Sequence, residues 1–474
     1  MAQLGPARRA ALSLVSQRRR RAARVRDLAR ADKKIAGLPA PDRALAFRLA
    51  MGATAAEQVL DALVDERLRR PSALEPRVRD ALRVAAFEIC YLDTPVAVAA
   101  SQGVELVRSV APRAVGLANA VLRRLAQEAR PLVEAARDRC VAGTCDAGDL
   151  SLALGLPAWL AARLLRDRGS RAAASLCLAQ LDAAPVYVAA NTLRQTPEEL
   201  VHELARSGMR PTPVPGLVGS FELGDVAPLA SSGLVPSGAA VVADLAAQLV
   251  CRIAAPDAGG AALLEVGQGR ATKSILLCTA AGVRHPSTLV GVDSVAYKVR
   301  VAGRRMREAG LSGMASSHRL DACELAGGGE GLPEQVDRLF DVVLVDAPCS
   351  GTGTMRRHPE IAASLAEPGI TELAGLQLRM LQASAARVAP GGVLVYATCS
   401  VLPEEDEQVV RAFLESASGR CFRVEDVATA PACRRDVALG QLVAERQTPE
   451  GFLLTIPSPG DEDGHFCARM VRVR

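Results

Sequence analysis

A regular alternation of strand-like and helical segments after residue 260 constrains the fold of this chain more than any other feature. Four apolar runs have the length and β-branched content of buried strands: Ala262–Val266, Leu289–Val292, Phe340–Val345 and Val393–Ala397. Helical patterns separate them, near residues 273–281, 294–309, 371–388 and 404–416. Because parallel strands need a crossover, usually a helix, the alternation predicts an α/β fold with a doubly wound parallel sheet. Two last runs, Phe452–Ile456 and Cys467–Val473, predict a closing antiparallel pair.

The first 150 residues differ from the rest in pattern and in charge. Between Ala31 and Gln127 the apolar residues recur at helical spacing, which predicts an all-helical bundle. This part carries 26 basic against 17 acidic side chains, whereas the remaining 324 residues carry 31 against 35. The excess includes the run Arg18, Arg19, Arg20 and Arg21. Such a run can neutralise phosphates and indicates a nucleic-acid partner, but it is equally typical of a solvated helix face.

Residues 151–250 form a third segment, with a helix near Trp159, a strand near 186–190 and a helix near 197–207. This pattern predicts a small mixed α/β unit. The small and polar run Val141–Asp149 separates it from the helical part. The chain is therefore expected to divide into domains at residues 1–148, 149–245 and 246–474.

The 12 cysteines of the chain favour a reducing, cytoplasmic setting, because they are scattered through a large chain that has an ample core. There is no Cys-x-x-Cys pair and no Cys/His cluster with zinc spacing, so no metal is expected. The nearest pair, Cys140 and Cys145, is interpreted as incidental. No run of 18 uncharged apolar residues and no signal-peptide pattern occurs, so neither membrane insertion nor secretion is expected.

Ligands of doubly wound sheets bind outside the carboxyl ends of the strands. After the first strand comes a glycine turn, Gly267-Gln268-Gly269, preceded by Glu265 and followed by Lys273. Glycines permit a tight turn and a close approach of a nucleotide, although such turns can be purely structural. Asp293 follows the second strand, where a carboxylate can accept the ribose hydroxyls, and Asp321 follows a weaker run near the place of an adenine. A helix N-cap is the competing interpretation of both aspartates.

The last two strands each deliver a cysteine to the same edge of the sheet. The run after Phe340 ends in Asp346-Ala347-Pro348-Cys349-Ser350-Gly351-Thr352-Gly353, and the next strand ends in Thr398-Cys399-Ser400. A single buried cysteine is usually a small hydrophobic residue. Because the topology brings both thiols to one cleft, a catalytic pair is favoured here. A redox pair is disfavoured, since the expected compartment is reducing.

These two motifs resemble the hallmarks of the NOL1/NOP2/Sun family of RNA cytosine-C5 methyltransferases. Arg356-Arg357-His358-Pro359-Glu360 resembles the stretch that follows the first hallmark, and Ser237-Gly238 with Asp244 and Gln248 resembles the approach to the sheet. Upstream, three stretches are similar to the NusB-like RNA-binding domain of the members that modify bacterial 16S rRNA. They are Pro41–Ala46, Asp93-Thr94-Pro95 and Asn119–Arg124, with Leu156–Leu160 in the place of the family's linker.

The resemblance covers nearly the whole chain. It implies a Rossmann-like, class I S-adenosylmethionine-dependent methyltransferase domain, preceded by an all-α NusB-like bundle and a small α+β linking domain. The sequence departs from the family in one place: the usual Cys-Ala-Ala-Pro-Gly-Gly-Lys-Thr turn is replaced by Gly267–Ser274, in which Lys273 and the next hydroxyl still align. Ala243 also replaces the Gln that usually precedes Asp244.

The resemblance implies a reaction as well. Carbon 5 of cytosine becomes nucleophilic only after a thiolate adds to carbon 6, and by resemblance Cys399 is this nucleophile and Cys349 aids product release. Asp346, supported by Lys273, would bind the base. The cofactor would be held by Glu265, Gly267, Gly269, Lys273, Asp293, Asp321, Asp346 and Pro348. Structured 16S rRNA would be bound by Arg18, Arg19, Arg20, Arg21, Arg123 and Arg124.

Two other functions fit parts of the sequence. A non-catalytic rRNA-binding or ribosome assembly factor would keep this scaffold while losing cofactor affinity through the altered glycine turn. An amino-group methyltransferase is disfavoured, because that chemistry uses an Asn/Asp-Pro-Pro-aromatic turn where this chain has Asp346–Cys349.

Overall fold

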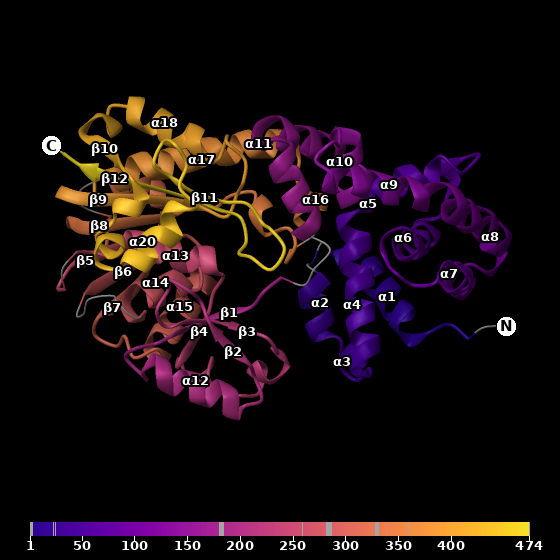
Figure 1. Ribbon diagram of the computed structural model, residues 1–474, viewed down its shortest axis with the longest axis horizontal. Coiled ribbons are helices and arrows are strands. Elements are labelled where there is room, and N and C mark those ends of the chain that lie inside the picture. The colour runs from indigo at the N-terminus through magenta and orange to yellow at the C-terminus, as the bar shows by residue number, and fades with distance from the viewer. Residues whose placement is uncertain are drawn as a thin grey trace. The chain divides into compact units, whose positions relative to one another are not determined.

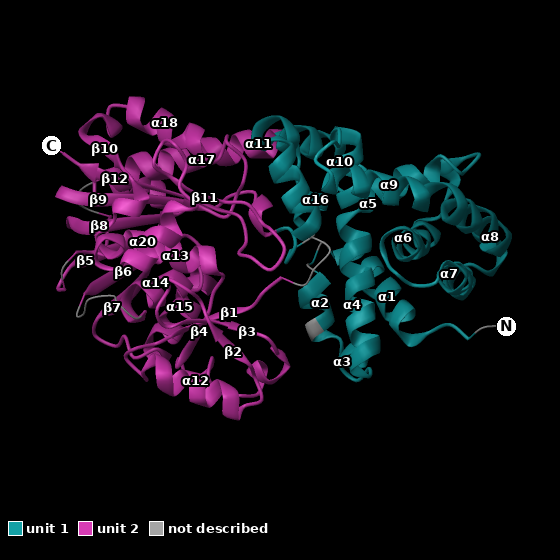
Figure 2. Ribbon diagram, in the orientation of Figure 1, with its two compact units in different colours: residues 1–182, 355–367 teal, residues 183–354, 368–474 magenta. Residues whose placement is uncertain are grey.

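The computed structural model of the chain describes residues 3–21, 23, 25–179, 184–257, 259–280, 287–327, 331–358 and 360–473, so Pro359 lies outside the described residues. The chain divides into two compact units (Figure 2). The first comprises residues 1–182 and 355–367, and the second comprises residues 183–354 and 368–474. The expected domain boundaries at residues 148 and 245 stay a prediction.

The first unit is built of helices. They are α1 (Pro6–Arg21), α2 (Val25–Ala31), α3 (Lys33–Ala36), α4 (Ala40–Ala55), α5 (Glu57–Asp65), α6 (Pro76–Tyr91), α7 (Val96–Val110), α8 (Val115–Arg124), α9 (Arg130–Val141), α10 (Ala147–Leu154), α11 (Ala158–Ala179) and α16 (Glu360–Ser364). Prolines stand in the first turns of α4, α6 and α9, where the missing N–H has no helical partner to lose. The buried Leu14, Leu49, Leu82 and Leu122 belong to one core that joins α1, α4, α6 and α8.

Close approaches between helices of this unit depend on small residues. A side chain at Gly52 of α4 would lie 1.9 Å from the ring of Phe87 in α6. Gly103 of α7 is similarly confined by Ala85 of α6, at 2.6 Å.

The segment that follows the first cysteine motif, residues 355–367, also belongs to this unit. Its α16 packs on α4, and the guanidinium of Arg26 donates a hydrogen bond to the carbonyl of Arg357.

No single helix of the described residues is both long and apolar enough to cross a membrane. One bent pair, α10 with α11, meets the criteria of length and composition when the two helices are taken together, and they meet at 120°.

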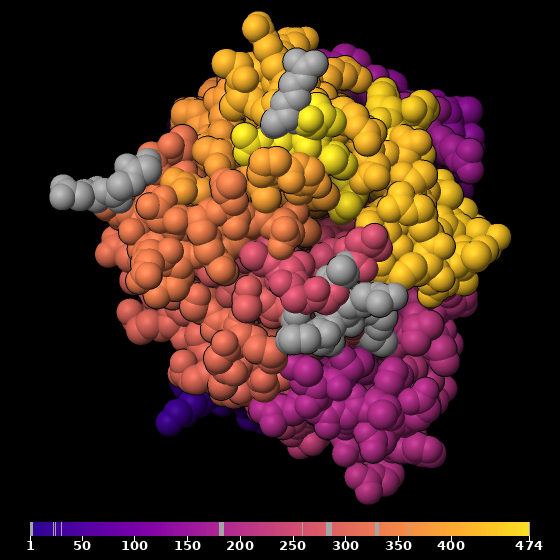
Figure 3. Space-filling model, turned by 90° about the vertical axis from the view of Figure 1, so that its left-hand side faces the viewer, coloured from indigo at the N-terminus to yellow at the C-terminus, as the bar shows by residue number. Residues whose placement is uncertain are grey.

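The second unit contains a small antiparallel sheet and a large mixed sheet (Figure 1). The small sheet has the order β2-β3-β1-β4, with β1 (Tyr187–Ala190), β2 (Pro211–Pro213), β3 (Ser220–Leu223) and β4 (Ala240–Val242). Helix α12 (Pro197–Arg206) lies in the loop between β1 and β2 and starts with a capping box of Thr196 and Glu199. In Figure 3 the magenta residues of this part of the chain lie at the bottom of the visible face, and the yellow C-terminal residues lie at its top and right.

The large sheet has the order β10-β12-β9-β8-β5-β6-β7, with β11 paired to β12. Its strands are β5 (Ala262–Val266), β6 (Thr288–Asp293), β7 (Ala315–Arg319), β8 (Phe340–Asp346), β9 (Val388–Thr398), β10 (Phe422–Glu425), β11 (Leu453–Thr455) and β12 (His465–Arg472). The five neighbouring strands β9, β8, β5, β6 and β7 are parallel to one another. Beyond β9, strand β12 pairs antiparallel with β9, and β10 pairs antiparallel with β12. The predicted α/β fold with a closing antiparallel pair is confirmed.

Helices cover both faces of the large sheet. On one face lie α13 (Leu245–Ala254), α14 (Thr272–Thr279), α15 (Ala296–Glu308), α19 (Pro431–Arg435) and α20 (Val437–Ala444). On the other lie α17 (Glu367–Ala385) and α18 (Glu407–Glu415). Because both faces are covered, the central strands are apolar at successive positions rather than at alternate ones. Because β5, β6, β8 and β9 are parallel, their carboxyl ends lie at one edge of the sheet, where the candidate site lies.

Candidate active site

The two cysteines predicted to converge do so. Strands β8 and β9 are adjacent and parallel, with Asp346 opposite Ala397, so the turns that follow them lie side by side. The Sγ atoms of Cys349 and Cys399 are 3.4 Å apart. Gly353 brings the first turn against the loop before β12, since a side chain there would lie 2.1 Å from the carbonyl oxygen of Gly464.

The surroundings shift the pKa values of the two thiols in opposite directions. The pKa of Cys399 is lowered, first by the hydrogen bond from Cys349 and also by the charge of Lys273, against the opposing effect of burial. The pKa of Cys349 is raised well above its usual value by the same hydrogen bond and by burial. Because the thiolate is the nucleophilic form, the site favours Cys399 as the thiolate and Cys349 as its hydrogen-bond donor.

Lys273 supplies the positive charge of the site. It stands in the first turn of α14, and its Nζ lies 2.7 Å from a carboxylate oxygen of Asp346 at the end of β8. Burial opposes the charged form of Lys273, but the neighbouring Asp346 outweighs it, so the pKa of Lys273 is raised. An ammonium that stays charged near Cys399 stabilises negative charge in the cleft.

Glu405 joins the two cysteine turns. It is fully buried, and its carboxylate accepts hydrogen bonds from the backbone N–H of Ser350 at 2.8 Å and from the hydroxyls of Ser350 at 2.5 Å and Ser400 at 2.7 Å. Gln377 of α17 donates to the same carboxylate at 3.0 Å and to the carbonyl of Pro348 at 2.9 Å. Each serine follows one of the cysteines, so a single carboxylate fixes both turns.

The glycine turn after β5 approaches the strand beside it closely. Gly267 has φ +78°, and a side chain there would lie 2.2 Å from the carbonyl oxygen of Asp346. Asp293, at the end of β6, accepts hydrogen bonds at 2.9 Å from the N–H groups of Gly269 and Val295. The carboxylate thus orders the glycine turn and the residues just before α15, whose N-cap position is Val295. Contact of Asp293 with ribose hydroxyls stays a prediction.

Glu265 lies beneath this turn with none of its surface exposed. Its Oε2 accepts a hydrogen bond from the hydroxyl of Ser274, but its Oε1 is buried without a partner in the described part of the chain. Burial raises the pKa of Glu265 to about 8. A buried oxygen without a partner costs free energy unless a ligand supplies a donor. With the Gly267 turn and Asp293, this oxygen makes the edge suited to an amine-bearing nucleoside.

The other predicted cofactor residues have different surroundings. Asp321 is exposed and caps a short 3-10 helix by accepting from the N–H of Cys323 at 3.0 Å. Pro348 is exposed between Asp346 and Cys349. Contact of either residue with a cofactor stays a prediction. Among the described residues no group of three or more His, Cys, Asp or Glu side chains is placed to hold a metal ion.

The arginines predicted to bind RNA fall into two groups. Arg18 and Arg19 form ion pairs within the helical unit, with Glu57 at 2.9 Å and with the fully buried Asp80 at 3.0 Å. The other four, Arg20, Arg21, Arg123 and Arg124, are exposed at the last turns of α1 and α8. Arg124 also pairs with Glu128 at 3.2 Å, an exposed contact of little energy.

Glu405 and Gln377 were missed at the sequence level. Glu405 stands in the acidic run Glu404–Glu407 before α18, a pattern typical of a solvated helix start. Gln377 lies within an amphipathic helix. The useful signal was the Ser that directly follows each cysteine, because two buried hydroxyls at adjacent strand ends need hydrogen-bond partners, and one carboxylate can accept from both.

Comparisons with known proteins agree with this geometry. A NusB family model matches residues 6–127, and a model described as 16S rRNA methyltransferase RsmB/F matches residues 317–471. The crystal structure of PH0851 superposes with a TM-score of 0.73 at 19% identity, covering 99% of this chain and 100% of that chain. A methyltransferase homolog from Pyrococcus horikoshii, with a TM-score of 0.54 and 19% identity, covers 69% of this chain and 98% of its own. These likenesses confirm the fold.

Curated relatives cover most of the chain. The ribosomal RNA small subunit methyltransferase B of Xanthomonas campestris is 31% identical over 379 residues, which is 79% of this chain and 80% of the relative. The protein of the same name from Thermus thermophilus is 32% identical over 378 residues, 79% of each chain. The chain, with its NusB-type helices and its methyltransferase sheet, therefore belongs to the ribosomal RNA small subunit methyltransferase B family of S-adenosylmethionine-dependent enzymes.

Proposed function

We propose that this protein methylates carbon 5 of a cytosine in 16S rRNA through a covalent bond between Cys399 and carbon 6 of the base. The observation that carries the proposal is the convergence of two thiols at the carboxyl ends of β8 and β9, with Sγ atoms 3.4 Å apart, next to the ion pair of Lys273 with Asp346. The names of the relatives support small-subunit rRNA as the substrate. The 12 free cysteines support a reducing compartment, the cytoplasm, as the place of the reaction.

The cofactor site follows from the residues at the carboxyl edge. Glu265, Gly267, Gly269 and Asp293 would hold S-adenosylmethionine, with Asp321 and Pro348 at its borders. When bound, this cofactor supplies an electrophilic methyl group to a nucleophilic carbon. The unpartnered Oε1 of Glu265 is the observation that supports the fit, since it offers a buried acceptor to an ammonium group.

The chain's own residues carry the steps at the base. The thiolate of Cys399 adds to carbon 6, and the electron pair of the C5–C6 double bond moves into the ring, which makes carbon 5 nucleophilic. Asp346 and Lys273 bind the polar edge of the base and stabilise the charge that develops there. After carbon 5 is methylated, its proton passes to a base in the site and the S–C6 bond breaks. The electron pair of that bond returns to Cys399 as thiolate.

Cys349 is assigned to product release. Its thiol lies 3.4 Å from the sulfur that must leave and donates the hydrogen bond that stabilises the departing thiolate. Removal of Cys349 should therefore slow elimination more than addition, and the covalent intermediate should accumulate.

The test is an adduct experiment with 16S rRNA transcript and S-adenosylmethionine. We expect the Cys349→Ala variant to form an RNA–protein adduct that survives denaturing electrophoresis, and the Cys399→Ala variant to form none. The converse pattern would exchange the roles of the two cysteines. If neither variant forms an adduct and the wild type transfers no methyl group, the chain is a non-catalytic rRNA-binding factor instead.

A further inference from the structure

Helix α15 is the most basic element of the second unit. Its 13 residues carry Lys298, Arg300, Arg304, Arg305 and Arg307 against a single acidic residue, Glu308. The rest of the chain from residue 151 onward carries 26 basic against 34 acidic side chains. A positive helix in an otherwise acidic segment is not explained by solubility, and it marks a place where negative charge is attracted.

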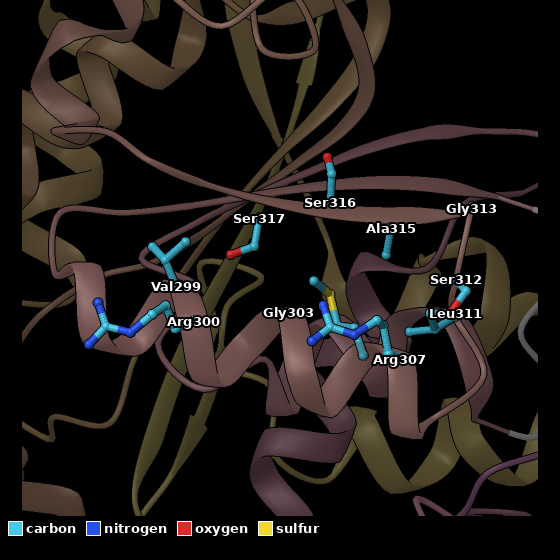
Figure 4. Close-up of a pocket in the computed structure, with 11 residues that line it drawn as sticks. Val299, Arg300, Gly303, Arg307, Leu311, Ser312, Gly313, Ala315, Ser316 and Ser317 are labelled. Atoms are coloured by element: carbon cyan, nitrogen blue, oxygen red, sulfur yellow. The ribbon is translucent and has the colours of Figure 1, made fainter.

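A hollow of about 580 Å³ lies between α15 and β7, the strand at the edge of the sheet (Figure 4). Arg300, Gly303 and Arg307 line its helix side, and Ser316 and Ser317 line its strand side. Residues 300, 303 and 307 recur on one helix face. A glycine within a helix costs about 1 kcal/mol relative to alanine, and here it keeps the floor of the hollow open between the two guanidinium groups.

The arginines of α15 have different partners. Arg305 is turned inward and donates to the carbonyl of Arg270 at 2.7 Å and to the hydroxyl of Thr272 at 3.0 Å, so it supports the glycine turn. Arg304 lies 3.7 Å from Glu308 on the exposed side. Arg300 and Arg307 are exposed and form no ion pair with any described residue. The hollow thus presents two positive groups with no carboxylate among its lining residues, which attracts anions.

We propose that this hollow binds backbone phosphates of the substrate RNA, at Arg300 and Arg307, as a surface separate from the basic helical unit. The inference rests on the proposed function. Guanidinium forks match phosphate geometry, and the hydroxyl of the exposed Ser312 adds a donor for phosphate oxygens. Tyr297, 57% exposed on the same helix, offers a ring on which an unpaired base can stack.

The position of the hollow suits an RNA whose target base enters at the cysteines. The sheet order places β7 three strands from β8, which bears the Asp346–Cys349 turn. At about 4.8 Å between neighbouring strands, this separation is roughly 14 Å across the sheet. The hollow lies beside the start of β7, whereas Cys399 follows the carboxyl end of β9, so the full separation exceeds this lateral distance. We expect a structured rRNA segment that delivers a flipped base to Cys399 to be long enough for its flanking phosphates to contact both places.

The test compares two double variants of the full-length protein. Arg300→Gln with Arg307→Gln removes the charges of the hollow, and Arg420→Gln with Arg423→Gln removes two exposed arginines at β10, the opposite edge of the same sheet. For the first variant we expect the slope of log affinity for 16S rRNA against log salt to become shallower by about 1.5 and the affinity at 0.1 M salt to fall roughly 10- to 50-fold. The KM for RNA should rise, while kcat at saturating RNA stays unchanged.

The control variant should leave the salt slope at the wild-type value. S-adenosylmethionine binding by calorimetry and the thermal unfolding profile should match the wild type in both variants, which separates a lost contact from misfolding. If the salt slope changes equally in the two double variants, or changes in neither, the proposal is wrong. The hollow would then be a candidate site for a protein partner instead. If the wild type binds rRNA but transfers no methyl group, the proposed function fails, whereas the phosphate surface is still judged by the slopes.

Discussion

Lys273 carries more of the chemistry than any other single charge in the site. It is one of four lysines in a chain that holds 57 basic residues. It forms an ion pair with Asp346 and lowers the pKa of the Cys399 thiol. Sequence reasoning placed this lysine in the site because it aligned with a known turn. The sequence did not reveal the direction of each thiol's shift, since that depends on which sulfur receives the hydrogen bond.

Replacing Lys273 with Met should raise the pKa of Cys399, because the charge that helps to lower it is lost. Less thiolate is then present at neutral pH, so the rising limb of the profile of kcat/KM against pH should move to higher pH. At pH 7 we expect methyl transfer to fall roughly 10- to 100-fold. The matched Lys273→Arg variant keeps the charge and should keep the position of the limb. An unmoved limb in Lys273→Met would show that the hydrogen bond from Cys349 alone sets the thiolate.

Ala271 is the one described non-glycine residue with positive φ, at +61°, directly before α14. This left-handed backbone conformation costs a non-glycine residue about 1 kcal/mol or more. The sequence does not indicate this strain, because alanine is a good helix former. Ala271→Gly should therefore raise the free energy of unfolding by about 0.5–1 kcal/mol, measured by thermal unfolding of the apo protein. Ala205→Gly, in exposed α12, should lower it by a similar amount. A decrease for both variants would mean that the turn is not strained.

At the level of elements, the sequence predicted those strands that are apolar along their whole length. Strands β5, β6, β8 and β9 lie where the apolar runs were found. Strand β7 was noted only as the weaker run before Asp321, and β10 was not predicted. Both are edge strands whose sequences, Ala-Ser-Ser-His-Arg and Phe-Arg-Val-Glu, are polar and bury little core. For the same reason the sequence did not predict the hollow beside β7. The positive charge of α15, in contrast, can be counted from the sequence.

The loops after β8 and β9 should lose their alignment in Glu405→Gln. One carboxylate oxygen becomes an NH2 group, so the charge-assisted bonds from Ser350, Ser400 and Gln377 weaken, at a cost of about 1–3 kcal/mol. We expect methyl transfer to fall while S-adenosylmethionine affinity is kept. Loss of this negative charge by itself would favour the Cys399 thiolate. Faster alkylation of Cys399 together with undiminished methyl transfer would therefore refute the positioning role.

The packing of α4 against α6 in the helical unit can be tested by substitutions at glycine. Gly52→Ala should destabilise this unit by about 1–3 kcal/mol, because the added methyl group would lie 1.9 Å from the Phe87 ring, which is itself stacked on Tyr91. Gly116→Ala in α8 meets nothing within 4 Å and should stabilise by up to about 1 kcal/mol. Chemical denaturation followed by circular dichroism distinguishes the pair. Equal effects of the two substitutions would argue against a close helix contact at Gly52.

On the scale of the whole molecule, the basic charge is divided between two uses. The excess in the first 50 residues predicted RNA contacts, but Arg18 and Arg19 are ion-paired with Glu57 and the buried Asp80 and so support the helical fold. Their neutralisation should lower stability, because it leaves a buried carboxylate with fewer partners. Arg20 and Arg21 are exposed and form no ion pair with any described residue, so their charges can meet phosphates. A count of charges cannot make this division, which depends on where α6 places Asp80.

The two units should act on one RNA, and their salt dependences test this. Arg20→Gln with Arg21→Gln should make the slope of log affinity against log salt shallower by about 1.5, as should the double substitution in α15. If one rRNA molecule contacts both surfaces at once, the counterions released are additive, and the quadruple variant should lose about 3 in slope. Filter binding between 50 and 200 mM salt measures it. A quadruple variant no shallower than either double variant would mean that the two surfaces bind RNA alternately, and the helical unit would then act in recruitment rather than during methyl transfer.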